Sequence, residues 1–208
     1  MTAPWSSPSR IVPGANLWRG CRIGLLGGSF NPPHGGHLHI SRLALKRLAL
    51  DSLWWLVSPQ NPLKAATGMA PFESRLAAAR ERAAGRRIMV TDIERRLGTR
   101  FTVDTVGALQ ASFPGTRFVW LMGADNLMQI PRWHRWAELF ENVPIAIFDR
   151  PAYAREALAG KAAERFRDYR IGEDQASGLA NRAAPAWLFA RIRTHPASSS
   201  EIRRRAAD

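Results

Sequence analysis

Residues 24–40 read GLLGGSFNPPHGGHLHI, with five glycines, two prolines and three histidines between two apolar segments. Glycines after an apolar segment indicate a tight turn that another group can approach closely, because no side chain stands in the way. Pro32 and Pro33 suit neither a strand interior nor a helix interior, since proline has no N–H to donate. We therefore expect a loop between Leu26 and Leu38. An amphipathic helix is predicted to follow in HLHISRLALKRLAL, so the unit reads strand, loop, helix.

The rest of the chain alternates between short apolar runs and helical segments. The apolar runs are CRIGLLG, SLWWLVS, RRIMVTDI, RFVWLMG, VPIAIFD and AWLFARI. Helical spacing or strong helix formers occur in PFESRLAAARERAA, FTVDTVGALQASF, PRWHRWAELFEN and AYAREALAGKAAERF. This alternation predicts an α/β fold, an open parallel sheet with helices on both faces. Ligands of such sheets bind beyond the carboxyl ends of the strands.

The domain organisation follows from length and pattern. A chain of 208 residues can bury a sizeable core, and we expect residues 21–208 to form one domain. Residues 1–20 are expected to be a flexible N-terminal extension. The longest loop is predicted at residues 174–186.

The composition of the chain narrows the kinds of binding partner and the cellular compartment that we expect. No apolar run approaches the roughly 20 residues that span a bilayer, and the N-terminus does not look like a secretion signal. The single cysteine, Cys21, cannot form an internal disulfide, so we expect a cytoplasmic protein without a membrane partner. A net charge of +13 favours anionic partners, either nucleic acid or phosphorylated metabolites, although a solvated arginine-rich surface would give the same charge.

Two histidines flank a glycine pair at the expected mouth of the first helix. Neither G-x-x-x-x-G-K-[ST] nor G-x-G-x-x-G occurs, which argues against a kinase-type P-loop and a dinucleotide fingerprint. If the helix begins near Gly36, its N-terminal N–H groups and dipole favour an anion beside His34 and His37. The rings could also be zinc ligands, but no cysteine or carboxylate nearby completes a shell. They could instead be simple turn or capping residues.

Two other segments carry local signals with two interpretations each. Residues 198–201, SSSE, have the form of a capping box before a helix, and the same hydroxyls and N–H groups could bind phosphates. Asp125 comes where the fourth strand should end. Its carboxylate could accept two ribose hydroxyls or could merely cap the next helix.

GGSFNPPHGGH resembles the G-G-x-F-x-P-x-H-x-G-H signature of the nucleotidylyltransferase superfamily. Within it, the chain is most similar to bacterial nicotinate-nucleotide adenylyltransferases. The further matching stretches are NPLK at 61–64, RFTVDTVGAL at 100–109, LMGADNLMQIPRWHRWAELF at 121–140 and SSSEIRRR at 198–205. The resemblance implies a Rossmann-like doubly wound parallel sheet.

The activity that the resemblance implies is adenylyl transfer from ATP to nicotinate mononucleotide in NAD biosynthesis, giving nicotinate adenine dinucleotide and pyrophosphate. Mg²⁺ would be the cofactor, held mainly by the phosphates of ATP. The partners would be these two substrates, with no nucleic acid, and formation of a homo-oligomer stays open. A phosphate nucleophile is already ionised at neutral pH, so the chemistry needs positioning and charge stabilisation rather than a general base.

The resemblance also assigns residues to the expected site, with no protein metal ligands. Catalysis would fall to His34, His37 and Arg203. The ATP site would comprise Gly28, Ser29, His34, His37, Lys64, Gly123, Asp125, Ser199, Ser200 and Arg203. The nicotinate mononucleotide site would comprise Gly27, Phe30, Thr102, Asp104, Asp125, Trp133, His134 and Arg150.

Some of these assignments have plain structural alternatives. Trp133 could be a core residue together with Trp136, and Thr102 and Asp104 could merely start a helix. His134 departs from the family pattern, because we associate a tyrosine with this position in the relatives.

Two other functions compete with the expected one. The first is a related adenylyltransferase that acts on nicotinamide mononucleotide or phosphopantetheine. The second is a basic, non-catalytic nucleic-acid-binding protein, although the arginines are scattered along the sequence rather than interleaved with aromatic residues.

Overall fold

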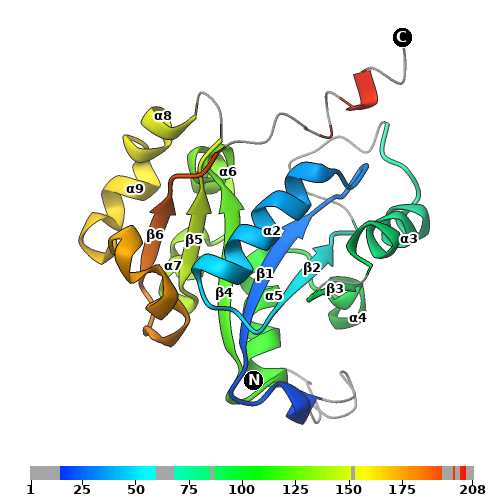
Figure 1. Cartoon of the computed structure of the whole chain (residues 1–208), viewed down its shortest axis with the longest axis horizontal. Helices are drawn as coiled ribbons and strands as arrows, with labels where there is room; N and C mark the ends of the chain where they lie inside the picture. Colours follow the sequence, from blue (N-terminus) through cyan, green and yellow to red (C-terminus); the bar gives the residue numbers. More distant parts are fainter. Residues whose placement is uncertain are drawn as a thin grey trace.

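A six-stranded, all-parallel sheet forms the centre of the molecule (Figure 1). The computed structural model describes residues 15–59, 68–84, 87–150, 153–193, 199 and 202–204. The strands are β1 (Arg22–Gly28), β2 (Ser52–Val57), β3 (Ile88–Thr91), β4 (Arg117–Gly123), β5 (Ile145–Phe148) and β6 (Trp187–Ala190). Their order across the sheet is β3-β2-β1-β4-β5-β6. The expected α/β fold is confirmed. Each predicted apolar run coincides with one of these strands, although β1 extends one residue beyond its run, to Gly28.

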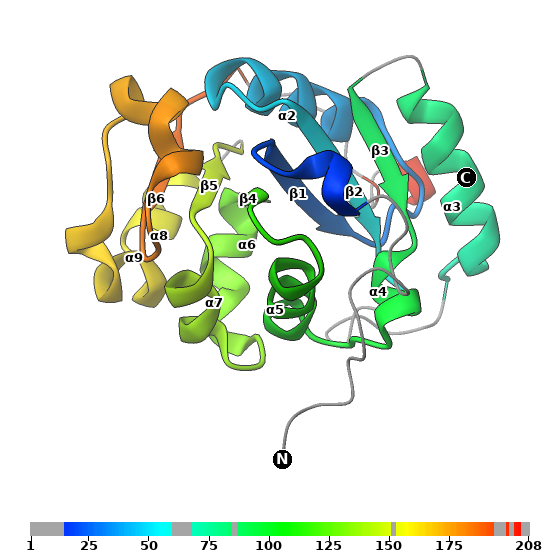
Figure 2. The same cartoon turned by 90° about the horizontal axis from the view of Figure 1, so that it is seen from below.

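Helices cover both faces of the sheet, as a doubly wound fold requires. The α-helices are α2 (Gly35–Arg47), α3 (Phe72–Ala83), α4 (Ile93–Leu97), α5 (Thr102–Ser112), α6 (Ala124–Gln129), α7 (Trp136–Asn142), α8 (Ala154–Leu158) and α9 (Lys161–Arg165). The 3-10 helices are η1 (Ala15–Trp18), η2 (Ile130–Arg132), η3 (Arg167–Tyr169) and η4 (Glu173–Asn181). Figure 2 shows α2 above the sheet, α5, α6 and α7 below it, and α3 beside the β3 edge. The buried residues of α3 pack in the same core layer as those of α2.

The sheet divides the core into two layers because successive side chains of a strand point to opposite faces. Trp54 and Trp55, adjacent in β2, illustrate this division. Trp54 packs in the layer of α5, where its ring meets Phe113 at 5.1 Å edge-on. Trp55 packs in the layer of α2 and stacks on Phe30 at 4.9 Å. Both tryptophans are buried, so β2 anchors the two layers.

Several predicted boundaries differ from the structure. The loop after β1 is shorter than expected, since the strand continues to Gly28 and α2 already begins at Gly35. The predicted loop at residues 174–186 is largely the 3-10 helix η4, which buries Ala176 and Leu179 against the sheet. Its small apolar residues give too weak a pattern for the sequence to reveal the helix.

Residues 15–20, the described part of the expected N-terminal extension, contact the core at a few points. In η1, Ala15 is buried and the Trp18 ring meets Trp54 edge-on at 5.2 Å. Gly20 N–H donates to Gly115 O at 2.9 Å. Residues 1–14, the remainder of the expected flexible extension, lie outside the described residues.

The parallel strands end at a common edge, which is uppermost in Figure 1. The chain order reverses between β1 and β4, so the crevice beyond their carboxyl ends is the expected ligand site. Within the described ranges, no helix is both long and apolar enough to cross a membrane.

Candidate active site

The loop between β1 and α2 brings both histidines to the carboxyl edge of the sheet. His34 is the N-cap of α2, and its Nδ1 accepts a hydrogen bond from Gly36 N–H at 3.1 Å. His37 Nδ1 in turn accepts from His34 N–H at 3.1 Å. This reciprocal pair is a capping box built from two imidazoles. The capping interpretation of these residues is therefore correct, and it is compatible with a second role.

The cap fixes which nitrogen of each ring can donate. A neutral imidazole carries one proton, and a nitrogen that accepts a hydrogen bond cannot carry it. Since Nδ1 accepts in both His34 and His37, the proton of each neutral ring is on Nε2. The two ring centroids lie 3.9 Å apart. The loop thus presents two neighbouring N–H donors at a helix N-terminus, an arrangement that suits an anion.

Aromatic packing holds this pair in place. Phe30 has φ 47°, in the left-handed region, and its ring is 1% exposed. The ring lies 4.7 Å from His37 and stacks on Trp55. Phe30 was predicted to contact the mononucleotide, but its ring faces the core, so only its backbone is left for such a contact.

The C-terminal part of the chain meets the same loop. Ser199 Oγ donates to Pro32 O at 3.0 Å, and the Arg203 guanidinium donates to Asn31 O. Residues predicted from two ends of the sequence are therefore neighbours in space. Lys64 and Ser200 lie outside the described residues.

Asp125 and Arg150 form an ion pair at the ends of β4 and β5. Arg150 Nη1 donates to Asp125 Oδ2 at 2.6 Å. The other carboxylate oxygen, Asp125 Oδ1, is buried and has no hydrogen-bond partner among the described residues. Gly123 makes room for this pair, because a Cβ there would lie 2.5 Å from Asp125 Oδ1. A buried acceptor that lacks a donor is poised to receive one from a ligand hydroxyl.

The residues predicted for the pyridine end come from two segments that contact each other, the start of α5 and the residues before α7. His134 packs against Phe101, directly before α5, with ring centroids 4.2 Å apart. Arg135 pairs with Asp104 at 3.1 Å, so Asp104 already has a partner. Thr102 is the first residue of α5 and is partly buried.

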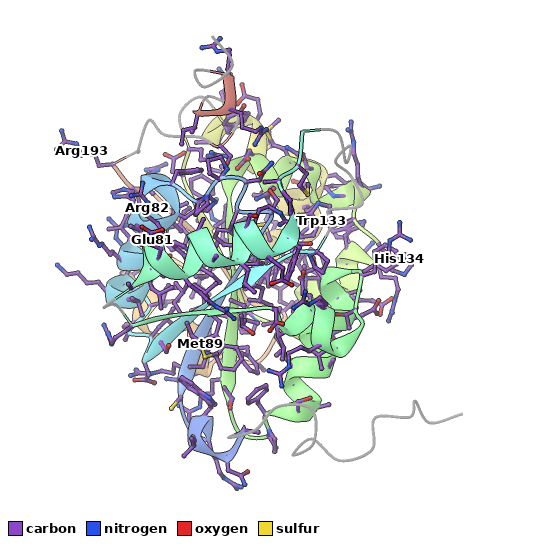
Figure 3. All side chains as sticks on the ribbon, turned by 90° about the vertical axis from the view of Figure 1, so that its right-hand side faces the viewer. Glu81, Arg82, Met89, Trp133, His134 and Arg193 are labelled. Atoms are coloured by element: carbon purple, nitrogen blue, oxygen red, sulfur yellow. The ribbon has the colours of Figure 1, made fainter. Side chains whose placement is uncertain are left out.

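Trp133 is partly buried and packs against the core layer of α5, so its core interpretation is correct in part. Figure 3 shows Trp133 and His134 on the same flank of the molecule, with His134 farther out.

The sequence did not predict a role for two buried residues in or beside the loop between β1 and α2, Arg75 and Asn31. Arg75 in α3 is 3% exposed and donates to the carbonyl oxygens of four residues, one of them Ser29 at 2.6 Å. Asn31 is buried, and its amide bonds to Gly68 O at 3.0 Å and to Ala70 N–H at 3.2 Å. Arg75 did leave a signal in the sequence, because it falls within the helical stripe that also buries Leu76 and Ala79.

Two ionisable groups near this loop have shifted pKa values. Burial lowers the pKa of Arg75, because removal from water disfavours the charged form. Burial also raises the pKa of Glu94 to about 7, and a hydrogen bond with Ser58 partly offsets this shift. Ser58 follows β2, and its N–H donates to Gly28 O at 2.9 Å. Both groups therefore lie close to the end of β1.

The chain is similar to known proteins in sequence. Residues 25–205 match the family model described as cytidylyltransferase-like. A protein of Parvibaculum lavamentivorans is 52% identical over 189 residues, 91% of this chain and 94% of its own. A protein of Gluconobacter oxydans is 53% identical over 182 residues, 88% of this chain and 93% of its own. Both are named probable nicotinate-nucleotide adenylyltransferase.

A solved structure shares the fold at much lower identity. It is Plasmodium falciparum nicotinic acid mononucleotide adenylyltransferase complexed with NaAD, with a TM-score of 0.65 and 18% identity. The match covers 88% of this chain and 83% of that one.

Proposed function

This chain belongs to the cytidylyltransferase-like family and, within it, to the nicotinate-nucleotide adenylyltransferases, and on this premise we propose that it transfers the adenylyl group of ATP to nicotinate mononucleotide. The observation that carries the proposal is the pair of Nδ1-capped imidazoles, His34 and His37, at the N-terminus of α2. The products are nicotinate adenine dinucleotide and pyrophosphate.

The reaction is a displacement at the α-phosphorus of ATP. A phosphate oxygen of nicotinate mononucleotide forms the new bond to this phosphorus. The bond between the α-phosphorus and the oxygen bridging to the β-phosphorus breaks, and its electron pair leaves with pyrophosphate. The nucleophile is ionised at neutral pH, so no proton has to be removed from it.

The protein's contribution is then to position groups and to stabilise charge. His34 and His37 would donate from Nε2 to non-bridging oxygens at the α-phosphorus, and Arg203 would assist from the C-terminal side. Donors that are fixed before the reaction need no reorganisation as charge develops. The capping bonds serve this purpose, because they prevent either ring from exchanging its donor nitrogen.

The other substrate would lie along the ends of β4 and β5. Asp125 Oδ1 can accept a ribose hydroxyl, and Arg150 can pair with the phosphate of the mononucleotide. Trp133, partly buried beside the core, would offer its remaining face to the pyridine ring, near Thr102 at the start of α5.

Mg²⁺ is proposed to arrive with ATP, held mainly by phosphate oxygens and water. Phosphate oxygens suit this ion, because Mg²⁺ prefers oxygen ligands and keeps several of its waters. When bound, the ion supplies neutralisation of the triphosphate and of departing pyrophosphate.

Pyrophosphate release is the direct test. Purified protein with Mg²⁺ and ATP is assayed with nicotinate mononucleotide, nicotinamide mononucleotide or phosphopantetheine as acceptor. We expect the highest kcat/KM with nicotinate mononucleotide. Faster turnover with either other acceptor would assign the chain a different substrate, and release equal to the acceptor-free rate would overturn the proposal.

A further inference from the structure

Arg75 lies where three segments meet beside the loop between β1 and α2, which carries His34. It belongs to α3, the helix that faces the viewer in Figure 3, where Glu81 and Arg82 are labelled at its exposed end. Unlike those two, Arg75 is 3% exposed. Such burial of a guanidinium is costly unless its N–H groups find acceptors.

The acceptors of Arg75 are all main-chain oxygens. Nη1 donates to Ser29 O at 2.6 Å and to Ser58 O at 2.8 Å. Nη2 donates to Pro59 O at 2.9 Å, and Nε donates to Ala70 O at 3.0 Å. A planar guanidinium fixes the directions of these donors, so one side chain ties the end of β1, the end of β2 and the residues before α3 together.

The contact with Ser29 gives Arg75 an effect on the histidines. Ser29 directly precedes Phe30, whose left-handed backbone turns the chain toward Asn31 and the cap residue His34. The side-chain amide of Asn31 is hydrogen-bonded to Gly68 O and Ala70 N–H, just before α3. Its main-chain carbonyl oxygen accepts a hydrogen bond from Arg203. The loop is therefore clamped at its start by Arg75.

The positive charge of Arg75 also matters. Among the described residues, the structure shows no ion pair for Arg75, so its charge is compensated by main-chain carbonyl dipoles and by the Phe72 ring, whose centroid lies 5.4 Å from Arg75 Cζ. A cation in this position, directly behind a loop that binds a polyanion, contributes an attractive potential without touching the substrate.

We infer that Arg75 is a positioning residue for adenylyl transfer: through Ser29 it sets the backbone that presents His34 and His37. This inference rests on the proposed function. Since misplacement by about 1 Å can cost on the order of 10²-fold in rate, loss of the clamp should lower kcat. Binding of either substrate should change less, because the groups that contact it stay present.

The kinetic test compares Arg75→Lys and Arg75→Gln with Arg80→Gln, an exposed arginine of the same helix. We expect both Arg75 variants to lose at least about tenfold in kcat while KM for each substrate changes by less than about threefold. Lysine keeps the charge but cannot make the forked contacts, so it should rescue little. Arg80→Gln should match the wild type. A Lys variant with wild-type kcat would overturn the inference.

A second measurement does not depend on catalysis. Amide hydrogen exchange in the ligand-free protein should accelerate at residues 31–37 in both Arg75 variants and stay unchanged in Arg80→Gln. Unchanged exchange would also overturn the inference. If the wild type released no pyrophosphate with nicotinate mononucleotide, the proposed function would fail while the exchange result still decided whether Arg75 positions the loop.

Chemical rescue separates positioning from general loss of structure. Arg75→Ala removes the side chain beyond Cβ, and added ethylguanidinium can refill the space. We expect ethylguanidinium to restore part of kcat, and ethylammonium, which has the charge without the fork, to restore less. Equal rescue by both ions, or by neither in a variant with a wild-type melting temperature, would count against the positioning role.

Discussion

At the scale of single residues, one side chain serves both the fold and the proposed chemistry. The two nitrogens of His37 divide these tasks. Nδ1 accepts from His34 N–H and so completes the cap of α2, whereas Nε2 carries the proton that we propose is donated to a substrate. A substitution can therefore remove one task and keep the other.

His37→Ala should lower kcat by about 10²-fold with a modest change in KM, because a preorganised donor acts mainly on the transition state. It should also cost about 1 kcal/mol of folding stability through loss of the cap. His37→Asn offers a side-chain oxygen that can cap, so it should recover stability without recovering kcat. Steady-state kinetics and thermal melts measure the two effects.

His39→Ala is the matched control in the same helix. His39 Nε2 lies 2.6 Å from Arg193 O rather than in the cap. Its kcat should be close to that of the wild type. If His37→Ala kept kcat within about threefold, His37 would be a structural cap only.

Glu94 predicts a pH dependence of stability. Its carboxyl ionises near pH 4.5 in the unfolded chain and near pH 7 in the folded protein. Between these values the folded state binds more protons, so this group makes the free energy of unfolding fall as pH rises, by at most about 1.4 kcal/mol per pH unit.

Glu94→Gln cannot ionise at this position. Its free energy of unfolding should match that of the wild type near pH 4.5 and exceed it above about pH 7. Denaturant unfolding across this range measures the difference. Glu81→Gln, on the exposed part of α3, is the control. A wild-type stability profile that Glu94→Gln leaves unaltered would contradict the burial of this carboxyl.

At the scale of the elements, the central strand β1 is shaped by its neighbours. A Cβ on Gly27 would lie 2.6 Å from the Trp120 ring of β4, and a Cβ on Gly24 would lie 2.7 Å from Leu50. Glycine at these positions lets large side chains lie across β1. The structure gives Gly27 a packing role, and its predicted contact with the substrate stays a prediction.

Gly27→Ala should therefore destabilise the fold by about 1–3 kcal/mol through overpacking. Trp120→Phe should relieve the clash, so the double variant should be more stable than the sum of the single effects predicts. Removing the indole costs no hydrogen bond, because Trp120 Nε1 has no partner among the described residues. Urea unfolding of the wild type, the two single variants and the double variant gives the coupling free energy between positions 27 and 120. Additive effects would show that the ring does not restrict position 27.

At the scale of the whole molecule, the sequence predicted the strands and helices but not the contacts between distant segments. The six strands followed from apolar runs, and α2 followed from the helical spacing of the apolar residues after Pro32, Pro33 and the glycines. The pairing of Arg150 with Asp125 and of Arg75 with Ser29 depends on how distant segments pack, which periodicity does not encode. The role of Arg75 was hidden for this reason, although its place among apolar residues of α3 was visible.

The net charge of +13 also acts at the scale of the molecule. A positive surface field raises the rate at which anionic substrates meet the site, and salt screens it. Raising the ionic strength from about 0.01 M to about 1 M shortens the Debye length from about 30 Å to about 3 Å. We therefore expect kcat/KM for ATP to fall several-fold over this range, while kcat changes little because the bound phosphates are close to their partners.

Stopped-flow or initial-rate measurements at low ATP, with KCl varied at constant Mg²⁺, test this expectation. Sucrose at matched osmolality controls for water activity and should leave kcat/KM unchanged apart from its effect on viscosity. If kcat fell with salt as steeply as kcat/KM, salt would be weakening the chemistry or the fold rather than the encounter. If neither parameter changed, the arginine-rich surface would be solvated without steering ATP, and contacts within the crevice alone would account for its capture.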